Sequence, residues 1–329
     1  MSHRSFLSMR TTAAMIVVLS LAPRSGVPTS LFGTYVEARA SLGGGAQAPA
    51  PKAAVYTPPR TPDGQPDMQG MWLPNGAGQP MERASGGDAP RPGRGGAGAN
   101  GGAARQPQKP MVVDPADGRV PLQPWAVARR DQIINNQHNL EDLDPRIKCM
   151  PSGVPRVNTP IAFNTYHFLQ IPGYVILLYE WNHISRIIPL DGRPHVNPNI
   201  HLWMGDSRGR WEGNTLVVDV TNFTDQTWIG GIGAAADGVP ASALTNGSGV
   251  FHTQALHVIE RFTLVDADTI HYDATIEDPT VFTQPWKLSW DAFKRAPKDH
   301  MLFEYACYEG GRRDLLLMTG VDVDATAAK

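Results

Sequence analysis

Apolar and polar residues alternate along much of the chain after residue 160. The clearest case is the run 269–277, in which Ile270, Tyr272, Ala274 and Ile276 alternate with polar residues. Successive side chains of a β-strand point to opposite faces. The alternation therefore predicts a strand with one apolar face, and residues 215–220 and 255–265 show related patterns.

Short turn sequences separate the predicted strands. Residues 172–173 (Pro-Gly), 212–214 (Glu-Gly-Asn) and 266–268 (Asp-Ala-Asp) each join two runs rich in aromatic and β-branched residues. We expect a hairpin at each of them, and a further hairpin at residues 191–192 (Asp-Gly), after the run 184–188.

One helix is expected among these strands, from about residue 121 to residue 136, because prolines stand where a first helical turn tolerates them. The last two strands are expected at residues 285–293 and 301–308. Strands do not alternate with helices, so a βαβ fold is excluded. The pattern predicts a mainly β fold, an antiparallel barrel or strongly curved sandwich, with one short N-terminal helix.

The N-terminal third has a different composition. Arg4 and Arg10 precede the apolar run 13–22, which predicts a signal peptide and a periplasmic or secreted protein. Glycine and proline dominate the following residues, which cannot bury enough apolar surface to order themselves. The expected organisation is a signal-peptide region (1–40), a disordered linker (41–110) with a docking segment (61–72), a barrel-like domain (111–320) and a disordered tail (321–329).

Charge and cysteine content restrict the partners. The net charge is −2, and no basic face is clustered, which argues against a nucleic-acid partner. We expect no cofactor and no stable membrane insertion after signal cleavage. Cys149 and Cys307 are the only cysteines, and export favours a disulfide between them over two buried thiols.

Several motifs occur together: DGRPH at residues 191–195, WMGDSRGRWEGNTLVVD at 203–219 and the segments 149–156 and 304–307. In this combination the chain resembles an uncharacterised family of exported bacterial proteins that is common in acidobacterial genomes. The chain departs from that family at Asn214, where Asp is usual, and in a longer loop at residues 230–249. The resemblance implies export and no particular reaction. The second motif also resembles strand pairs of lipocalin-type barrels.

Most of the candidate chemistry lies in or near residues 180–223, where histidines, arginines, tryptophans and carboxylates are densest. Acid–base chemistry needs imidazole and carboxylate groups in one enclosure. The catalytic candidates are His195, His257, Glu260 and Glu180. The ligand-binding candidates, which could line a polar and aromatic pocket, are Arg186, Arg193, Trp203, Trp211, Tyr166, Arg261 and Glu304.

Each group also has a structural interpretation. Glu260 or Glu304 could pair with Arg186 or Arg261 in the core, because buried charges require partners. The aromatic residues could be plain core. His183, His195 and His201 do not have the spacing of a common zinc motif, so we expect no metal. Residues 205–209 (GDSRG) match the G-x-S-x-G pattern, but they lie among predicted strands rather than at a strand-to-helix turn, so we do not expect Ser207 to act as a nucleophile.

The sequence therefore predicts an exported β-barrel-like protein that binds a small organic ligand in a polar and aromatic pocket. An acid–base enzyme, a hydrolase, lyase or isomerase that uses the same residues, is the alternative. A structural envelope protein is the third possibility.

Overall fold

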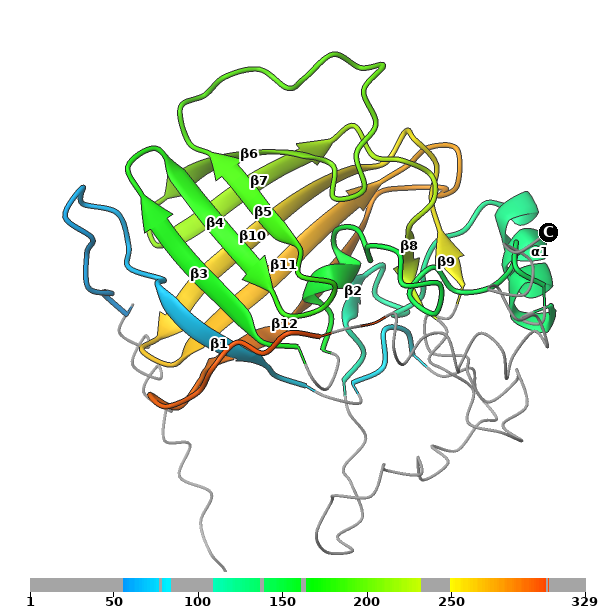
Figure 1. Cartoon of the computed structure of the whole chain (residues 1–329). Coiled ribbons are helices and arrows are strands. Elements are labelled where there is room, and N and C mark those ends of the chain that lie inside the picture. Colours follow the sequence, from blue (N-terminus) through cyan, green and yellow to red (C-terminus); the bar gives the residue numbers. More distant parts are fainter. Residues whose placement is uncertain are drawn as a thin grey trace, which may run out of the picture. The chain divides into compact units, whose positions relative to one another are not determined.

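The computed structural model describes residues 56–76, 79–83, 109–136, 139–160, 164–231, 249–305 and 307. The signal-peptide region, most of the linker, most of the 230–249 loop and the C-terminal tail lie outside this part of the chain. Figure 1 shows strands that curl into a barrel-like sheet. The strands are β1 Gly70–Pro74, β2 Val112–Asp114, β3 Tyr166–Ile171, β4 Tyr174–Tyr179, β5 Ser185–Pro189, β6 Asp206–Glu212, β7 Thr215–Thr221, β8 Trp228–Gly230, β9 Val250–Phe251, β10 His257–Asp266, β11 Thr269–Glu277 and β12 Trp286–Arg295.

The main sheet is antiparallel and has the order β5-β4-β3-β1-β12-β11-β10-β7-β6, with β2 paired to β12. β5 and β6, its two edge strands, contact each other through side chains. A Cβ atom on Gly209 of β6 would lie only 2.6 Å from Ile188 Cγ2 of β5, so glycine permits this approach. Arg186 Nε also donates to Ser207 Oγ across the seam (2.9 Å). The sheet is thus a nearly closed barrel, which confirms the predicted fold class.

Three of the predicted hairpins are present. Residues 172–173 join β3 to β4, residues 213–214 join β6 to β7, and residues 267–268 join β10 to β11. Gly173 and Gly213 have positive φ values of 80° and 63°, as tight reversals require. The hairpin expected at residues 191–192 is wrong: the chain leaves β5 there in a long loop and returns as β6, with no ladder between the two strands.

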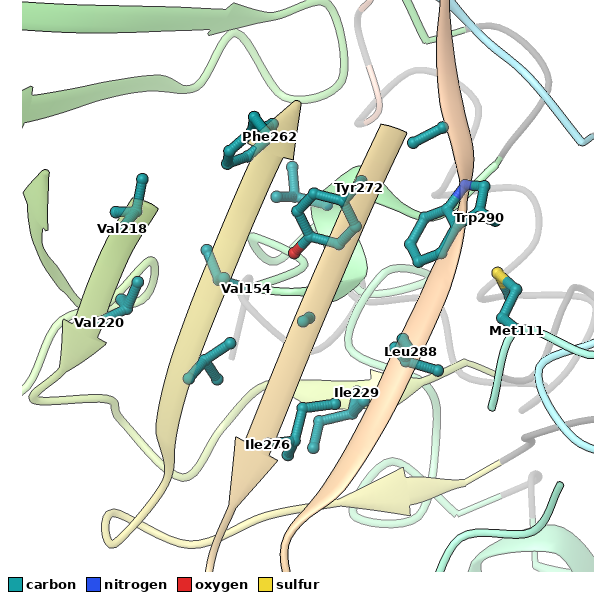
Figure 2. Packing of buried hydrophobic residues seen from close by; sticks show 14 of the residues in the cluster. Met111, Val154, Val218, Val220, Ile229, Phe262, Tyr272, Ile276, Leu288 and Trp290 are labelled. Carbon is teal, nitrogen blue, oxygen red and sulfur yellow. The ribbon is translucent and has the colours of Figure 1, made fainter. Parts of the chain in front are cut away.

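The barrel interior is filled by side chains. All four apolar residues of the alternating run in β11 are fully buried, as are Leu216, Val218 and Val220 of β7. Figure 2 shows Phe262, Tyr272 and Trp290 projecting from neighbouring strands to the same side of the sheet. Rings from several strands pack edge to face, as in the contact of Phe168 with Phe262 (5.9 Å between centroids). The interior is therefore a close-packed core.

The segment expected to dock on the barrel contributes a strand to it. β1 lies between β3 and β12, and Trp72 at its centre is fully buried. Trp72 Nε1 donates to the carbonyl of Met68 (3.0 Å), which satisfies the one polar atom of the ring. Part of the predicted linker is thus integral to the barrel wall.

One end of the barrel is covered by short elements. The helix α1 (Pro124–Asn135) falls within the range expected from the sequence. The short 3₁₀ helix η1 (Arg156–Asn158) is buried, and the β8–β9 hairpin lies near α1 at this end of the barrel (Figure 1). Asn158 of η1 reaches into the interior, where its amide donates to Glu260 (2.9 Å).

The expected disulfide between Cys149 and Cys307 is present, with 5.6 Å between the Cα atoms. A disulfide is compatible with the predicted export. The strand expected at residues 301–308 is wrong for the described residues 301–305, which make only an isolated bridge between Tyr305 and Trp181.

Among the residues that the structure describes, no helix is long and apolar enough to cross a membrane.

Candidate functional site

Glu260, one of the predicted catalytic residues, lies at the centre of the barrel with no exposed surface. One carboxylate oxygen accepts hydrogen bonds from Asn158 (2.9 Å) and Tyr272 (2.8 Å), and the other accepts one from Arg186. Burial lowers the pKa of Arg186, but the charge and hydrogen bond of Glu260, together with Tyr179 and Tyr272, outweigh burial and raise it. The enclosed and fully paired carboxylate favours the structural role over the catalytic one.

The other predicted residues in the barrel wall are also engaged in packing. Tyr166 is fully buried, donates its hydroxyl to Val157 O (3.2 Å), and has its pKa raised by burial. Glu180, just after β4, accepts a hydrogen bond from the backbone of Thr165 (2.9 Å). Trp211 is half-buried against the core.

The remaining ligand-binding candidates are spread over the surface. Arg193 is exposed and pairs with Asp191, two residues before it. Arg261 lies on the outer face of β10 and pairs with Glu212 (2.9 Å). Trp203 lies in the loop between β5 and β6, and Glu304 is exposed in the C-terminal segment. Together with the buried Arg186 and Tyr166, these residues are distributed over the core, the outer face and two loops rather than gathered at one place.

The two predicted catalytic histidines do come together, on the outer face of the barrel. His257 of β10 lies 2.9 Å from Asp219 of β7 through Nε2, and His195 of the β5–β6 loop lies 3.6 Å from the same carboxylate oxygen. The other nitrogen of His257 lies 3.5 Å from Glu277. We call His195, Asp206, Asp219, His257 and Glu277 the outer cluster.

Asp206 orients the His195 ring. Its carboxylate accepts hydrogen bonds from His195 Nδ1 (2.9 Å), from the backbone of Val196 (3.0 Å) and from Arg208 (2.7 Å). At 3.6 Å from Asp219, the Nε2 atom of His195 lies beyond hydrogen-bond distance. A carboxylate that fixes one ring nitrogen and leaves the other open is the arrangement from which a histidine can exchange protons with a substrate.

No metal centre is formed by the residues that the structure describes: no three of their His, Cys, Asp or Glu side chains are grouped to hold an ion. The three histidines of the 180–223 stretch are engaged differently. His195 belongs to the outer cluster, His201 approaches the carbonyl of Phe223 (3.2 Å), and His183 lies in the turn after β4.

His271, a further histidine on the outer face, makes the stability of the fold depend on pH in a way that can be tested. The side chains of Asp273 and Asp291 raise the pKa of His271 to about 9, against the effect of burial. A raised pKa means that the ion pairs stabilise the fold fully below about pH 6.5 and that this contribution is lost as the pH rises through 9. We expect the His271 ring to titrate near pH 9 in an NMR titration, and near its ordinary value in the double variant Asp273→Asn, Asp291→Asn. Titration of the wild-type ring near pH 6.5 would contradict this expectation.

A pocket of about 270 Å³ lies outside the barrel, between α1, the segment 141–150 and the β8–β9 hairpin. We call it the end pocket. Its apolar wall comes from Ile133, Met150, Trp228 and Phe251. Ile133 and Trp228 are themselves buried and form a small apolar cluster of their own, so this wall is supported from behind.

Charged side chains line the rest of the end pocket: Arg129, Glu141, Lys148 and Asp225. Lys148 donates to the carbonyl of Leu140 (3.1 Å), and burial lowers its pKa. Arg129 pairs with Asp142. The pocket thus combines an apolar wall with groups of both charges.

His252 also lines the end pocket and is uncharged. Its Nδ1 lies 2.9 Å from the carbonyl of Thr253, which can only accept, so Nδ1 carries the proton. Its Nε2 lies 2.7 Å from the Thr227 hydroxyl, and burial lowers the pKa of the ring. A neutral ring therefore accepts the hydroxyl proton at Nε2, and both ring nitrogens are used within the protein.

Sequence reasoning missed the end pocket entirely. Its lining comes from four stretches of the chain, residues 129–133, 141–150, 225–228 and 251–252, which carry no shared motif. The aromatic residue Trp228 is a sequence signal that could have marked the position. Whether Lys148 and Asp225 are paired cannot be seen in the sequence, because the pairing of a charge depends on the fold.

Comparisons with models of protein families, with curated proteins and with solved structures found no match for this chain.

Proposed function

We propose that the protein binds a small organic ligand in the end pocket. The observation that carries this proposal is that an apolar wall and unlike charges converge there on one concavity. The barrel interior, where the sequence places the ligand, is occupied by core side chains and by the ion pair of Arg186 with Glu260. A ligand site at the covered end of the barrel is consistent with both facts.

The walls of the end pocket are held in place, which reduces the entropic cost of binding. Lys148 and Met150 flank Cys149, whose disulfide to Cys307 fixes this part of the wall. On the facing side, Trp228 is almost fully buried in the hairpin formed by β8 and β9.

A ligand screen on the full-length chain tests the proposal. A bound ligand raises the midpoint of thermal unfolding, since at 100 times its Kd it adds about 2.7 kcal/mol of stability. Gln226 lines the rim of the pocket and is exposed, so Gln226→Trp should fill the opening without disturbing the fold. We expect that variant to lose the ligand-induced rise and the matched variant Gln254→Trp, at an exposed position outside the pocket, to keep it. An equal ligand-induced rise of the unfolding midpoint in both variants would mean that the ligand binds outside the end pocket.

Acid–base catalysis at the outer cluster is a second candidate function, and the orientation of His195 by Asp206 favours it. Carbethoxylation, which attacks an unprotonated and accessible ring nitrogen, tests the state of the two histidines. We expect His195 to react faster than His257, because His195 Nε2 lacks a hydrogen bond whereas both nitrogens of His257 face carboxylates. Mass spectrometry measures the rate of modification at each ring. Equal rates at His195 and His257 would contradict this second function.

A further inference from the structure

Three of the four charges that line the end pocket make no ion pair within the part of the chain that the structure describes. Around the pocket, Arg129 pairs with Asp142, and Arg156 pairs with Asp144 (2.6 Å). Lys148, Glu141 and Asp225 make no ion pair with any residue that the structure describes. Glu141 and Asp225 are exposed, but Lys148 is half-buried, and an unpaired ammonium group there is a specific feature because buried charges are normally paired.

Lys148 is the half-buried cation of the pocket, and the carboxylates that act on it, Asp142 and Asp144, are each paired with an arginine. The Lys148 ammonium group donates only one hydrogen bond within the described residues, to the carbonyl of Leu140. An ammonium group has three N–H donors. Arg129, on the neighbouring helix, uses one nitrogen for Asp142 and has further N–H groups at the same pocket. An anionic group of a ligand would compensate this side of the pocket.

Asp225 carries the opposite charge to Lys148 and can bind a cationic group of a ligand. It lies in the connection between β7 and β8, on a different segment from Lys148, and it is exposed at the pocket. Glu141 supplies a second carboxylate at the rim. A carboxylate only accepts hydrogen bonds, so a ligand group that meets Asp225 has to donate. An ammonium group does so and also supplies the missing charge.

Apolar side chains form another part of the pocket lining. Trp228, Phe251 and Ile133 present rings and methyl groups, and His252 is neutral with both nitrogens already bonded. The central part of a ligand therefore gains from apolar contact and finds no polar partner there.

From these contacts we infer that the end pocket binds a zwitterion of amino-acid size, with its carboxylate at Lys148, its ammonium group at Asp225 and an apolar side group against Trp228. This ligand class rests on the binding function proposed above. A simple anion would leave Asp225 and Glu141 uncompensated, and a simple cation would be repelled by Lys148 and Arg129. A zwitterion satisfies both sides, and a volume of about 270 Å³ accommodates such a molecule.

Calorimetric titration of the full-length chain at neutral pH tests the inference with four kinds of probe: leucine, phenylalanine, their N-acetyl derivatives and their methyl esters. The free amino acids should bind, and blocking either charged end should weaken binding at least tenfold. Lys148→Met and Asp225→Asn should each weaken binding of the free amino acid by a similar factor. Lys298→Met and Asp131→Asn, at exposed positions outside the pocket, should leave it unchanged.

The pairing of each charge with one end of the ligand gives a sharper control. Lys148→Met should not weaken the methyl ester further, because that probe already lacks the carboxylate, and Asp225→Asn should not weaken the N-acetyl derivative further. Unfolding midpoints of the variants show whether each remains folded.

Two outcomes would overturn the inference in different ways. If neutral indole or phenol binds in a manner sensitive to Gln226→Trp while no free amino acid binds, the pocket is a ligand site and the zwitterion class is wrong. If neither kind of probe binds, both the zwitterion class and the proposed ligand-binding function are wrong. Binding of free amino acids that is indifferent to Lys148→Met and Asp225→Asn would also refute the assignment, since the ligand would then lie at another site.

Discussion

Replacing Glu260 by alanine is expected to lower the free energy of unfolding by about 3–5 kcal/mol, because Arg186 would remain in the core without its counter-charge. Arg186 is fully enclosed, and one of its terminal nitrogens, NH1, already lacks a protein partner in the described region. Asn158 and Tyr272 would each lose an acceptor as well. Urea-induced unfolding of the full-length chain measures the loss.

Two comparisons separate this effect from a general loss of packing. His195→Ala, in the half-exposed outer cluster, should leave stability nearly intact because the ring buries little area. The double variant Glu260→Leu, Arg186→Met removes both charges together and should recover most of the lost stability. If Glu260→Ala and His195→Ala unfold at the same urea concentration, the ion pair does not stabilise the barrel.

Replacing both cysteines by serine should cost about 5 kcal/mol, because the disulfide between Cys149 and Cys307 closes a loop of 158 residues in the unfolded chain. The double substitution avoids a free thiol. Urea-induced unfolding of the variant, compared with wild type under oxidising conditions, measures the change.

The C-terminal segment also has a non-covalent attachment. Tyr305 stacks on Trp181 (4.4 Å between centroids), and the guanidinium of Arg146 lies 3.7 Å from the Trp181 ring. Burial, with repulsion from Arg156, lowers the pKa of Arg146 to about 9. A loss below 1 kcal/mol in the double-serine variant would mean that this stack, rather than the disulfide, holds the segment.

The strands that could be predicted are those whose signal is local. The alternation in β11 and the glycines at positions 173 and 213 act within a few residues, so the pattern places both the buried face and the turn. β1 could not be placed this way, because its five residues follow a region rich in glycine and proline and its neighbours β3 and β12 are distant in the sequence. The Asp191-Gly192 pair has a turn composition, but no local signal shows that the next strand begins only at residue 206.

The same distinction applies to the candidate sites. His195 and His257 were singled out by residue type; the register of β7 with β10 brings His257 to Asp219, and the loop between β5 and β6 brings His195 to the same carboxylate. Glu260 was recognised as a charge that needs a partner, and its partner, Arg186, is one of the arginines considered for that role. The end pocket depends on contacts between four separate stretches of the chain, which no pattern within any one of them indicates.

The position of β1 determines the order in which this barrel can assemble. Trp72 pairs with Arg295, so one ladder of the wall joins residues more than 200 positions apart. Contacts of such long range slow folding, because a large loop has to close before they form. The hairpins from β3 to β11 can form as soon as they are synthesised, but β1 remains without its β12 neighbour until residue 295 is available. A chain truncated before β12 would therefore expose Trp72 and two unpaired strand edges, the surface from which misassembly starts.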